Sequence, residues 1–558
     1  MNAATWKNIV GKQEEKLSLD IAAQYLGSQQ PQFAEIVLKK VLSANPRNTR
    51  ANELMAHIAG QAGDKESALH HLTQACRQPD CSPGALYFLG TAHLGLGKFP
   101  EAIVTLRRAV DKNAHFFEAL HDLGLACALA GQASESIEYL TRALSLRPDS
   151  FEALTNLGNS LRKAGRFEES LTQQSRAIAV NPHSPECWMN RGVAHYELGH
   201  GEDALADYEQ TLQLDPAYAE AWSNKGNALC ALNRPRDALE AYAKAIDLRR
   251  DDYSSYWNSA LAMMALGDYE SGWPYYEYRW KRQNADTLRH TGLARLERLA
   301  DARDKTIRVW SEQGFGDTLQ FARYIPMLVA RGAQVEFEVQ PELFSLFDGQ
   351  FDCRIVARGS ANVEADFQIP LMSLPMLFGT RLETIPTPCI LRIPSDKTRK
   401  WEARLPRPTG RLKLGIACRG SSRHENDRNR SMALAQFAPL LEFADLVVIQ
   451  KDMHPDDLAF LECSPQISFP GADIGDFLDS AAIVMNMDMI LSVDTSLAHL
   501  AGALDRPALI LLPWAAEWRW LGERPDSPWY PHATLLRQPC PGDWHAVIAE
   551  AAEKLDAR

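Results

Sequence analysis

The sequence lacks the signatures of several protein classes. No apolar run approaches the roughly 18 to 20 residues that a membrane-spanning helix needs, and residues 1–20 have no apolar core of the signal-peptide kind. Acidic residues outnumber basic residues, and the resulting net charge of −12 argues against a general nucleic-acid binder. The ten cysteines form no C-x-x-C pair, which favours reduced thiols over a zinc site or a disulfide framework. We therefore expect a cytoplasmic protein.

The first half of the chain repeats with a fixed period. Glycine recurs every 34 residues, and proline closes successive units. Small residues at fixed places let two antiparallel helices approach closely, and proline ends the second helix of each pair. One pair cannot bury its apolar face alone, so neighbouring pairs stack into a superhelix. The recurring residues are Gly90, Gly124, Gly158, Gly192 and Gly226, with Pro148, Pro182 and Pro216.

This pattern resembles the tetratricopeptide repeat (TPR) and implies an α-solenoid of about eight helix pairs over residues 1–282. Four asparagines recur in phase, on the helix expected to line the concave surface: Asn156, Asn190, Asn224 and Asn258. A carboxamide both donates and accepts, so this series can hold the backbone of an extended peptide. It resembles the peptide groove of the nucleocytoplasmic O-linked N-acetylglucosamine transferase. The alternative is that each asparagine satisfies local hydrogen bonds.

The 34-residue period ends after residue 282, and the second half of the chain has a different pattern. Short β-rich runs alternate with helical stretches, which predicts parallel sheets covered by helices on both faces. We expect a linker over 283–304, two doubly wound lobes over 305–398 and 412–558, and an interlobe linker over 399–411. Ligands of such sheets bind outside the carboxyl ends of the strands.

Two motifs at predicted strand ends suit an anionic ligand. In the first, a Gly-x-Gly turn precedes Asp317, which either acts as a general base or only caps its helix. The second lies between residues 399 and 430, where ten Lys or Arg face three acids. Guanidinium groups beside hydroxyls suit phosphate recognition, whereas a solvated charge run is the alternative. The members of this second motif are Arg419, Ser421, Ser422, Arg423, His424, Arg428 and Arg430.

Two further motifs lie near the predicted ligand. In the stretch LSVDTSLAHLAGAL (491–504), Thr495 or Ser496 can cap a helix whose first-turn amides form a phosphate receptor. His499 follows, either facing the ligand or packed inside the lobe. In the aromatic loop (residues 513–531), Trp518 and its neighbours stack on a base or sugar, or else anchor the loop to its lobe.

The order of these motifs resembles the lipopolysaccharide heptosyltransferases, which have the two-lobed GT-B glycosyltransferase fold with Rossmann-like lobes. The resemblance implies that Asp317 is the base, although Ser496 stands where glycine is usual. It places the donor diphosphate on Asp494, Thr495, Ser496, Leu497 and His499.

The whole chain resembles bacterial TPR glycosyltransferases, including those that modify flagellin, through GDYESGWPYYEYRW (267–280) and EWRWLGERPDSPWYP (517–531). This resemblance implies transfer of a sugar from a nucleotide-sugar co-substrate to Ser or Thr of a protein acceptor. We expect no metal ion and no further cofactor, because Arg428 and Arg430 with the 494–499 helix start would neutralise the leaving group. The alternatives are a non-catalytic TPR adaptor with a degenerate transferase region, and a transferase that acts on lipopolysaccharide or another glycan. The identity of the sugar stays open.

Overall fold

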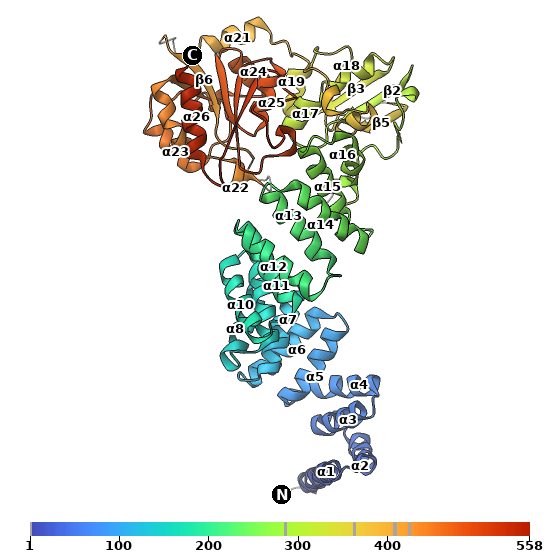
Figure 1. The fold of residues 1–558 in the computed structure, drawn as a ribbon. Coiled ribbons are helices and arrows are strands. Elements are labelled where there is room, and N and C mark those ends of the chain that lie inside the picture. Colours follow the sequence, from blue (N-terminus) through green and yellow to red (C-terminus); the bar gives the residue numbers. More distant parts are fainter. Residues whose placement is uncertain (1–2, 284–286, 361–363, 406–409, 422–425, 558) are drawn as a thin grey trace. The chain divides into compact units, whose positions relative to one another are not determined.

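The computed structural model describes residues 3–283, 287–360, 364–405, 410–421 and 426–557. The chain forms two compact units, Met1–Tyr218 and Ala219–Arg558 (Figure 1). None of the helices in the described part of the chain has the length and apolar character required to span a bilayer.

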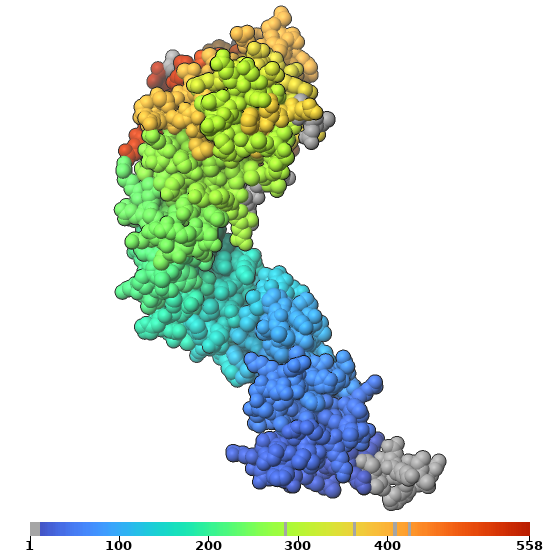
Figure 2. Space-filling view, turned by 90° about the vertical axis from the view of Figure 1, so that its right-hand side faces the viewer, coloured from blue at the N-terminus to red at the C-terminus, as the bar shows by residue number. Residues whose placement is uncertain are grey.

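The first unit is a series of helix pairs that follow one another in chain order. In the space-filling view of Figure 2, its colours change gradually from blue to cyan in the order of the sequence. Each helix contacts the next one along the chain. The helices are α1 (Ala3–Gly27), α2 (Pro31–Ala44), α3 (Thr49–Gln61), α4 (Lys65–Cys76), α5 (Pro83–Gly95), α6 (Phe99–Lys112), α7 (Phe117–Leu129), α8 (Ala133–Leu146), α9 (Phe151–Lys163), α10 (Phe167–Val180), α11 (Pro185–Glu197) and α12 (Gly201–Leu214).

The glycine column brings the two helices of a pair together, as predicted. A Cβ added at Gly90 would lie 2.5 Å from Leu106 Cγ, and one added at Gly124 would lie 2.6 Å from Leu140 Cγ. These separations are shorter than a van der Waals contact, so only glycine lets each leucine pack at this depth. The prolines also stand where they were expected, since Pro148 lies two residues beyond the last residue of α8.

The second unit begins with two more helix pairs: α13 (Ala219–Ala231) and α14 (Pro235–Leu248), then α15 (Tyr253–Ala265) and α16 (Tyr269–Tyr276). The short helix η1 (Glu277–Trp280) follows. The segment predicted as a linker over 283–304 contributes to a sheet instead, because its strand β1 (Ala294–Arg295) pairs in parallel with β5 (Phe367–Pro370).

The first sheet has the strand order β1-β5-β2-β3-β4, and all of its pairs are parallel. The chain moves outward from β2 through β3 to β4 and then returns to the other side of β2. Its elements are η2 (Leu299–Ala302), β2 (Thr306–Trp310), α17 (Phe315–Phe321), α18 (Tyr324–Val329), β3 (Gln334–Val339), α19 (Pro341–Phe347), β4 (Arg354–Ala357), β5, η3 (Leu371–Ser373), α20 (Leu374–Leu377) and η4 (Leu382–Thr384).

The second sheet has the order β10-β9-β8-β6-β7, again with parallel pairs. The strand order reverses between β6 and β8, and the carboxyl ends of these two strands are where a doubly wound sheet binds its ligand. Its elements are β6 (Leu412–Ala417), α22 (Asp427–Arg430), η5 (Leu434–Glu442), β7 (Ala444–Val448), α23 (Pro455–Glu462), η6 (Gly471–Asp473), α24 (Phe477–Val484), β8 (Met489–Val493), α25 (Ser496–Ala503), β9 (Ala508–Leu512), η7 (Trp518–Trp520), β10 (Ala533–Arg537) and α26 (Trp544–Asp556).

The predicted interlobe linker is partly helical. Helix α21 (Ser395–Glu402) buries Trp401, whose indole nitrogen donates a hydrogen bond of 2.8 Å to Asp479 of α24. The segment therefore packs on the second sheet's layer of helices. The last helix pair and both sheets share one hydrophobic core, to which Trp273, Phe321 and Trp518 all belong.

Candidate functional site

The candidate site lies where helix α17 of the first sheet meets helix α25 of the second. A Cβ added at Gly316 would lie 2.5 Å from His499 Cδ2. The glycine of the predicted Gly-x-Gly turn therefore lets the two helices touch. Strand ends from both sheets are thereby brought near each other.

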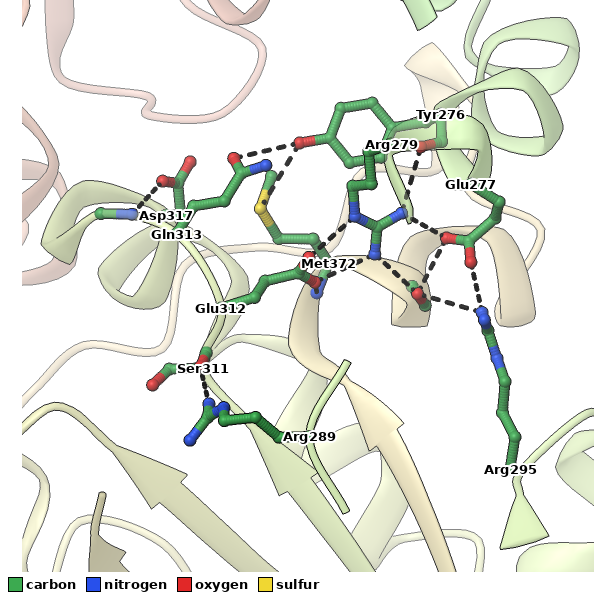
Figure 3. Close-up of polar contacts among 12 residues, drawn as sticks. Tyr276, Glu277, Arg279, Arg289, Arg295, Ser311, Glu312, Gln313, Asp317 and Met372 are labelled. Atoms are coloured by element: carbon green, nitrogen blue, oxygen red, sulfur yellow. Dashed lines mark hydrogen bonds and ion pairs between the residues drawn. The ribbon is translucent and has the colours of Figure 1, made fainter. Parts of the chain in front are cut away.

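Asp317 occupies the third position of α17, and both of its carboxylate oxygens accept hydrogen bonds. Oδ2 accepts one of 2.8 Å from the backbone N–H of Gly314, a cap that Figure 3 shows. Oδ1 accepts another from the guanidinium of Arg519 in the aromatic loop. The capping role is thus present, and a role as base would require Asp317 to exchange one of these partners for a substrate.

Arg519 joins three acceptors at this junction. Besides Asp317, its guanidinium donates to Glu517 and to Gln320 Oε1, the latter at 2.5 Å. The group also stacks on Trp518, with 4.5 Å between the guanidinium carbon and the ring centroid. Burial opposes its charge, but the carboxylates of Glu517 and Asp317 outweigh burial and raise the pKa of Arg519. Its positive charge is therefore fixed between the two sheets.

Glu517 is a candidate acid–base group that the sequence analysis did not identify. Desolvation raises its pKa from 4.5 to about 7, against the opposing charge of Arg519, and Asp494 and Asp317 add to the rise. Its side chain keeps 31% of its surface exposed. A carboxyl that exchanges protons near neutral pH and remains reachable suits general acid–base chemistry. The available signal was an acidic residue between tryptophans in the loop after the last core strand.

The start of helix α25 agrees with the predicted cap. Thr495 is the N-cap, and its hydroxyl accepts a hydrogen bond of 3.3 Å from the backbone N–H of Leu497. Ser492 Oγ lies 3.1 Å from Thr495 Oγ1 and donates to the carbonyl of Val493 at 2.7 Å. These bonds fix the turn after β8, so that Ser496 begins the helix at the carboxyl edge of the sheet.

Arg430 links the two strand ends at which the order of the second sheet reverses. Its Nη1 donates a hydrogen bond of 3.0 Å to the carbonyl of Asp494, after β8. A Cβ added at Gly420, after β6, would lie 2.4 Å from Nη2 of the same guanidinium. The charge of Arg430 is therefore held beside the start of α25.

Another arginine of the segment has a partner elsewhere. Arg419 pairs with Asp457 of α23, and this hydrogen bond raises the pKa of Arg419. Arg428 and Ser421 are exposed. The remaining members of the motif, Ser422, Arg423 and His424, lie outside the described residues.

His499 is enclosed by packing and is not presented at the strand end. Only 5% of its surface is exposed, its Nδ1 lies 2.9 Å from Tyr530 Oη, and its ring stacks on Trp520. Burial, reinforced by the nearby guanidinium of Arg519, holds the pKa of His499 well below its ordinary value. His499 therefore takes the packed position of the two alternatives, as a neutral histidine of the core, and a role in donor binding stays a prediction.

Trp518 is likewise buried, with 3% exposure. Its ring meets that of Trp273 edge to face at 5.6 Å, and the rings of Tyr269 and Trp529 surround it. The ring therefore lies in the anchoring position, which is one of the two alternatives drawn from the sequence. The reason is that helix α16 supplies aromatic partners from a distant part of the chain.

The η1 segment, directly after the last helix pair, forms polar contacts at the carboxyl edge of the first sheet, and Figure 3 shows them. The guanidinium of Arg279 donates to Glu312 after β2 at 2.7 Å and to Ser373 after β5 at 2.9 Å. Burial raises the pKa of Glu312, and the charge of Arg279 opposes that rise. The η1 segment therefore packs against the carboxyl ends of β2 and β5.

The four predicted groove asparagines are half-buried, and the two units divide them. In the first unit, Asn156 Nδ2 lies 3.1 Å from His121 Nε2. In the second, Asn258 Nδ2 donates to Asn227 Oδ1 at 2.8 Å. These two carboxamides therefore form the local hydrogen bonds that the alternative interpretation expects. A peptide-holding role for Asn156, Asn190, Asn224 and Asn258 stays a prediction.

Comparison with known proteins identifies the helical array. Residues 53–112, 87–151, 155–219 and 194–233 match one tetratricopeptide-repeat family, and residues 219–252 match another. The array consists of tetratricopeptide repeats. Such repeats are protein-interaction modules, because stacked pairs present an extended surface to a partner.

A curated relative is Protein FlbA of Caulobacter vibrioides, which is 23% identical over 329 residues. The match covers 53% of this chain and 54% of FlbA, so the chain spans about half the length of that relative. Among solved structures, MamA is 22% identical, with 31% of this chain and 94% of that chain covered and a TM-score of 0.29. YrrB, described as a TPR protein with an unusual peptide-binding site, is 20% identical, with coverages of 33% and 95% and a TM-score of 0.30. No functional conclusion follows from these likenesses.

Proposed function

We propose that the chain is a glycosyltransferase that moves a sugar from a nucleotide-sugar donor to a Ser or Thr hydroxyl of a protein bound by the repeats, such as flagellin. The supporting observation is a group of charged side chains between the two sheets. Arg430 and Asp494 lie after β6 and β8, Glu517 and Arg519 lie in the aromatic loop, and Asp317 lies on α17.

The donor phosphate is assigned to the start of α25. A nucleotide leaving group gains negative charge as the glycosidic bond breaks, and fixed positive groups lower the energy of that state. Arg430 supplies a full charge, while the first turn of the helix from Ser496 supplies the partial charge of its dipole. The hydroxyl of Thr495 lies at the same edge.

The acceptor proton is assigned to Glu517. In the proposed step, the acceptor oxygen bonds to the anomeric carbon, the nucleotide phosphate leaves with the bonding pair, and the hydroxyl proton passes to the carboxylate. A pKa of about 7 leaves a substantial fraction of Glu517 ionised near neutral pH. Asp317, the base that the heptosyltransferase resemblance implies, would then position Arg519 beside Glu517.

A non-catalytic adaptor is the competing function, and the contacts of three predicted site residues are compatible with it. Asp317 is paired with Arg519, while His499 and Trp518 are enclosed by aromatic rings. A region that had lost its substrate would retain such contacts because they stabilise the fold.

A nucleotide panel separates the two functions. We expect at least one of UDP, GDP, CDP, dTDP and CMP to raise the melting temperature of the full chain, since a ligand of the native state stabilises it. Arg430→Ala should abolish that shift, and Arg303→Ala, whose side chain is 81% exposed, should keep it. No shift with any member of the panel would support the adaptor.

Transfer itself is tested with the nucleotide sugar that corresponds to the stabilising nucleotide. Glu517→Gln should lower the rate of donor turnover by about 100-fold to 10,000-fold, which is the usual contribution of a general base. Asp317→Asn should lower it less, because it acts through Arg519. A larger loss of donor turnover in Asp317→Asn than in Glu517→Gln would indicate that Asp317 is the base.

A further inference from the structure

We propose that helices α11 and α12 of the first unit carry a surface site for a divalent transition-metal ion of the zinc class, held by His195, His200 and Asp203. His195 lies in the last turn of α11, His200 is the N-cap of α12, and Asp203 lies in the first turn of α12. One potential ligand atom from each residue falls within a group whose members all lie within 4.8 Å of one another. This site departs from the expectation, drawn from the sequence, that the protein binds no metal.

The separations suit tetrahedral coordination. Zinc–nitrogen bonds of about 2.1 Å in a tetrahedron place ligand atoms about 3.4 Å apart. The Nδ1 atoms of His195 and His200 are 3.5 Å apart. Asp203 Oδ2 is 4.0 Å from His195 Nδ1, and its side chain, 69% exposed, can close the remaining fraction of an ångström by a small rotation.

The backbone brings the two histidines together before any ion binds. Gly199, with φ of +81°, provides the left-handed turn between the helices, a conformation that glycine adopts without strain. The N–H of His200 then donates a hydrogen bond of 2.9 Å to the carbonyl of His195. Little chain entropy is therefore lost when a metal ion joins the side chains.

The second ring nitrogen of His195 faces a fixed carboxylate. Its Nε2 lies 4.0 Å from Asp207 Oδ2. Asp207 is itself held by two hydrogen bonds of 2.6 and 2.8 Å from the guanidinium of Arg191. Metal-binding histidines commonly direct their other nitrogen at a carboxylate, which orients the ring and increases its basicity.

The two adjacent repeats have neither histidine at these positions, although an earlier repeat has His93 at the position of His195. At the position of His200, the preceding and following repeats have Arg166 and Arg234. These arginines pair with the acid three residues on, Glu169 and Asp237 respectively, as ordinary surface ion pairs.

At the position of His195, the same two repeats have Leu161 and Leu229, and both leucines are buried. In the repeat between them, histidine stands at both of these positions and the acid is Asp203. Two imidazoles and a carboxylate form a ligand set that zinc prefers, with a fourth position left for water.

The test uses the untagged full chain, stripped of metal and titrated with Zn²⁺ alone in competition with a chromogenic chelator. We expect one zinc ion per chain, and a rise in melting temperature with zinc. Co²⁺ at the same site should give the visible absorption of a tetrahedral complex. The double variant His195→Leu/His200→Arg restores the residues of the neighbouring repeats, so the fold should be kept while zinc affinity falls at least tenfold.

His183→Ala is the matched control, because His183 is an exposed histidine in the turn before α11. This variant should bind zinc like the unchanged chain. Asp203→Asn should weaken binding without removing it. Equal zinc affinity in the unchanged chain and the double variant, or the absence of stoichiometric binding, would overturn the proposal.

Discussion

The carboxylate of Asp317 on helix α17 accepts a hydrogen bond from the guanidinium of Arg519 in the loop after β9. Residues 202 positions apart are thus paired across the junction of the two sheets. Both side chains are mostly buried, with 17% and 9% of their surfaces exposed. Their contact therefore contributes to stability as well as to the charge of the candidate site.

Asp317→Asn should destabilise the second unit. A hydrogen bond to a charged group contributes about 1.5 to 3 kcal/mol, and the substitution leaves Arg519 with Glu517 alone as its carboxylate partner. Denaturant unfolding followed by tryptophan fluorescence would measure the change. Asp301→Asn is the control, because Asp301 forms a surface ion pair with Arg298 and its loss should cost at most about 1 kcal/mol. Equal effects of the two substitutions would contradict the buried pair.

Glu517 should make stability depend on pH. Its pKa is raised in the folded chain, so the folded state binds more protons than the unfolded state between pH 4.5 and about 7. The contribution of Glu517 to stability is therefore complete at pH 4.5 and is lost as the pH rises to about 7. Melting temperatures across this range should fall more steeply for the unchanged chain than for Glu517→Gln. Parallel curves would show that Glu517 titrates normally.

Gly316→Ala should separate α17 from α25. The added methyl group would lie 2.5 Å from the ring of His499, which is fixed by Trp520 and Tyr530, and overpacking of this kind costs about 1 to 3 kcal/mol. The control is Gly292→Ala, where an added Cβ meets nothing within 4 Å. Thermal unfolding of the two variants should differ by several degrees. If Gly316→Ala unfolds like the control, the two helices are not in contact in solution.

Trp518 should matter for folding and not for ligand stacking. Trp518→Ala removes a core side chain and should cost about 3 to 5 kcal/mol, measured by denaturant unfolding. Trp514→Ala, in the same loop but half-buried, should cost less. Trp518→Phe keeps an aromatic ring in the core and should preserve the melting-temperature shift of any nucleotide that binds. Loss of that shift in an otherwise stable Trp518→Phe variant would indicate a ring that contacts the ligand.

Local pattern was sufficient to predict much of the fold. The glycines at 90 and 124 lie where one helix must touch the next, so their spacing reports the repeat directly. Most strands of the second sheet are short apolar runs, and the cap of α25 at Thr495 follows from a small polar residue before an apolar helix.

The contacts of the candidate site could not be predicted from local sequence pattern. A helix start does not reveal which neighbour will cover each face, so His499 could be placed on α25 but its enclosure by Trp520 and Tyr530 could not be foreseen. The same holds for Trp529 and Tyr269, whose side chains are hydrogen bonded at 3.1 Å although 260 positions separate them. Contacts of this range leave no periodic signal in the sequence.

The hydrogen bond between Arg279 and Glu312 indicates where a fragment of the second half must begin if it is to fold on its own. A fragment starting at residue 305 would keep every strand from β2 onward but would lose the arginine that neutralises Glu312. It would also expose to water the faces of Phe321 and Trp518 that Trp273 now covers. The boundary between helical array and sheets is therefore not a place where the polypeptide can be cut, and the shortest self-sufficient version must include the final repeat.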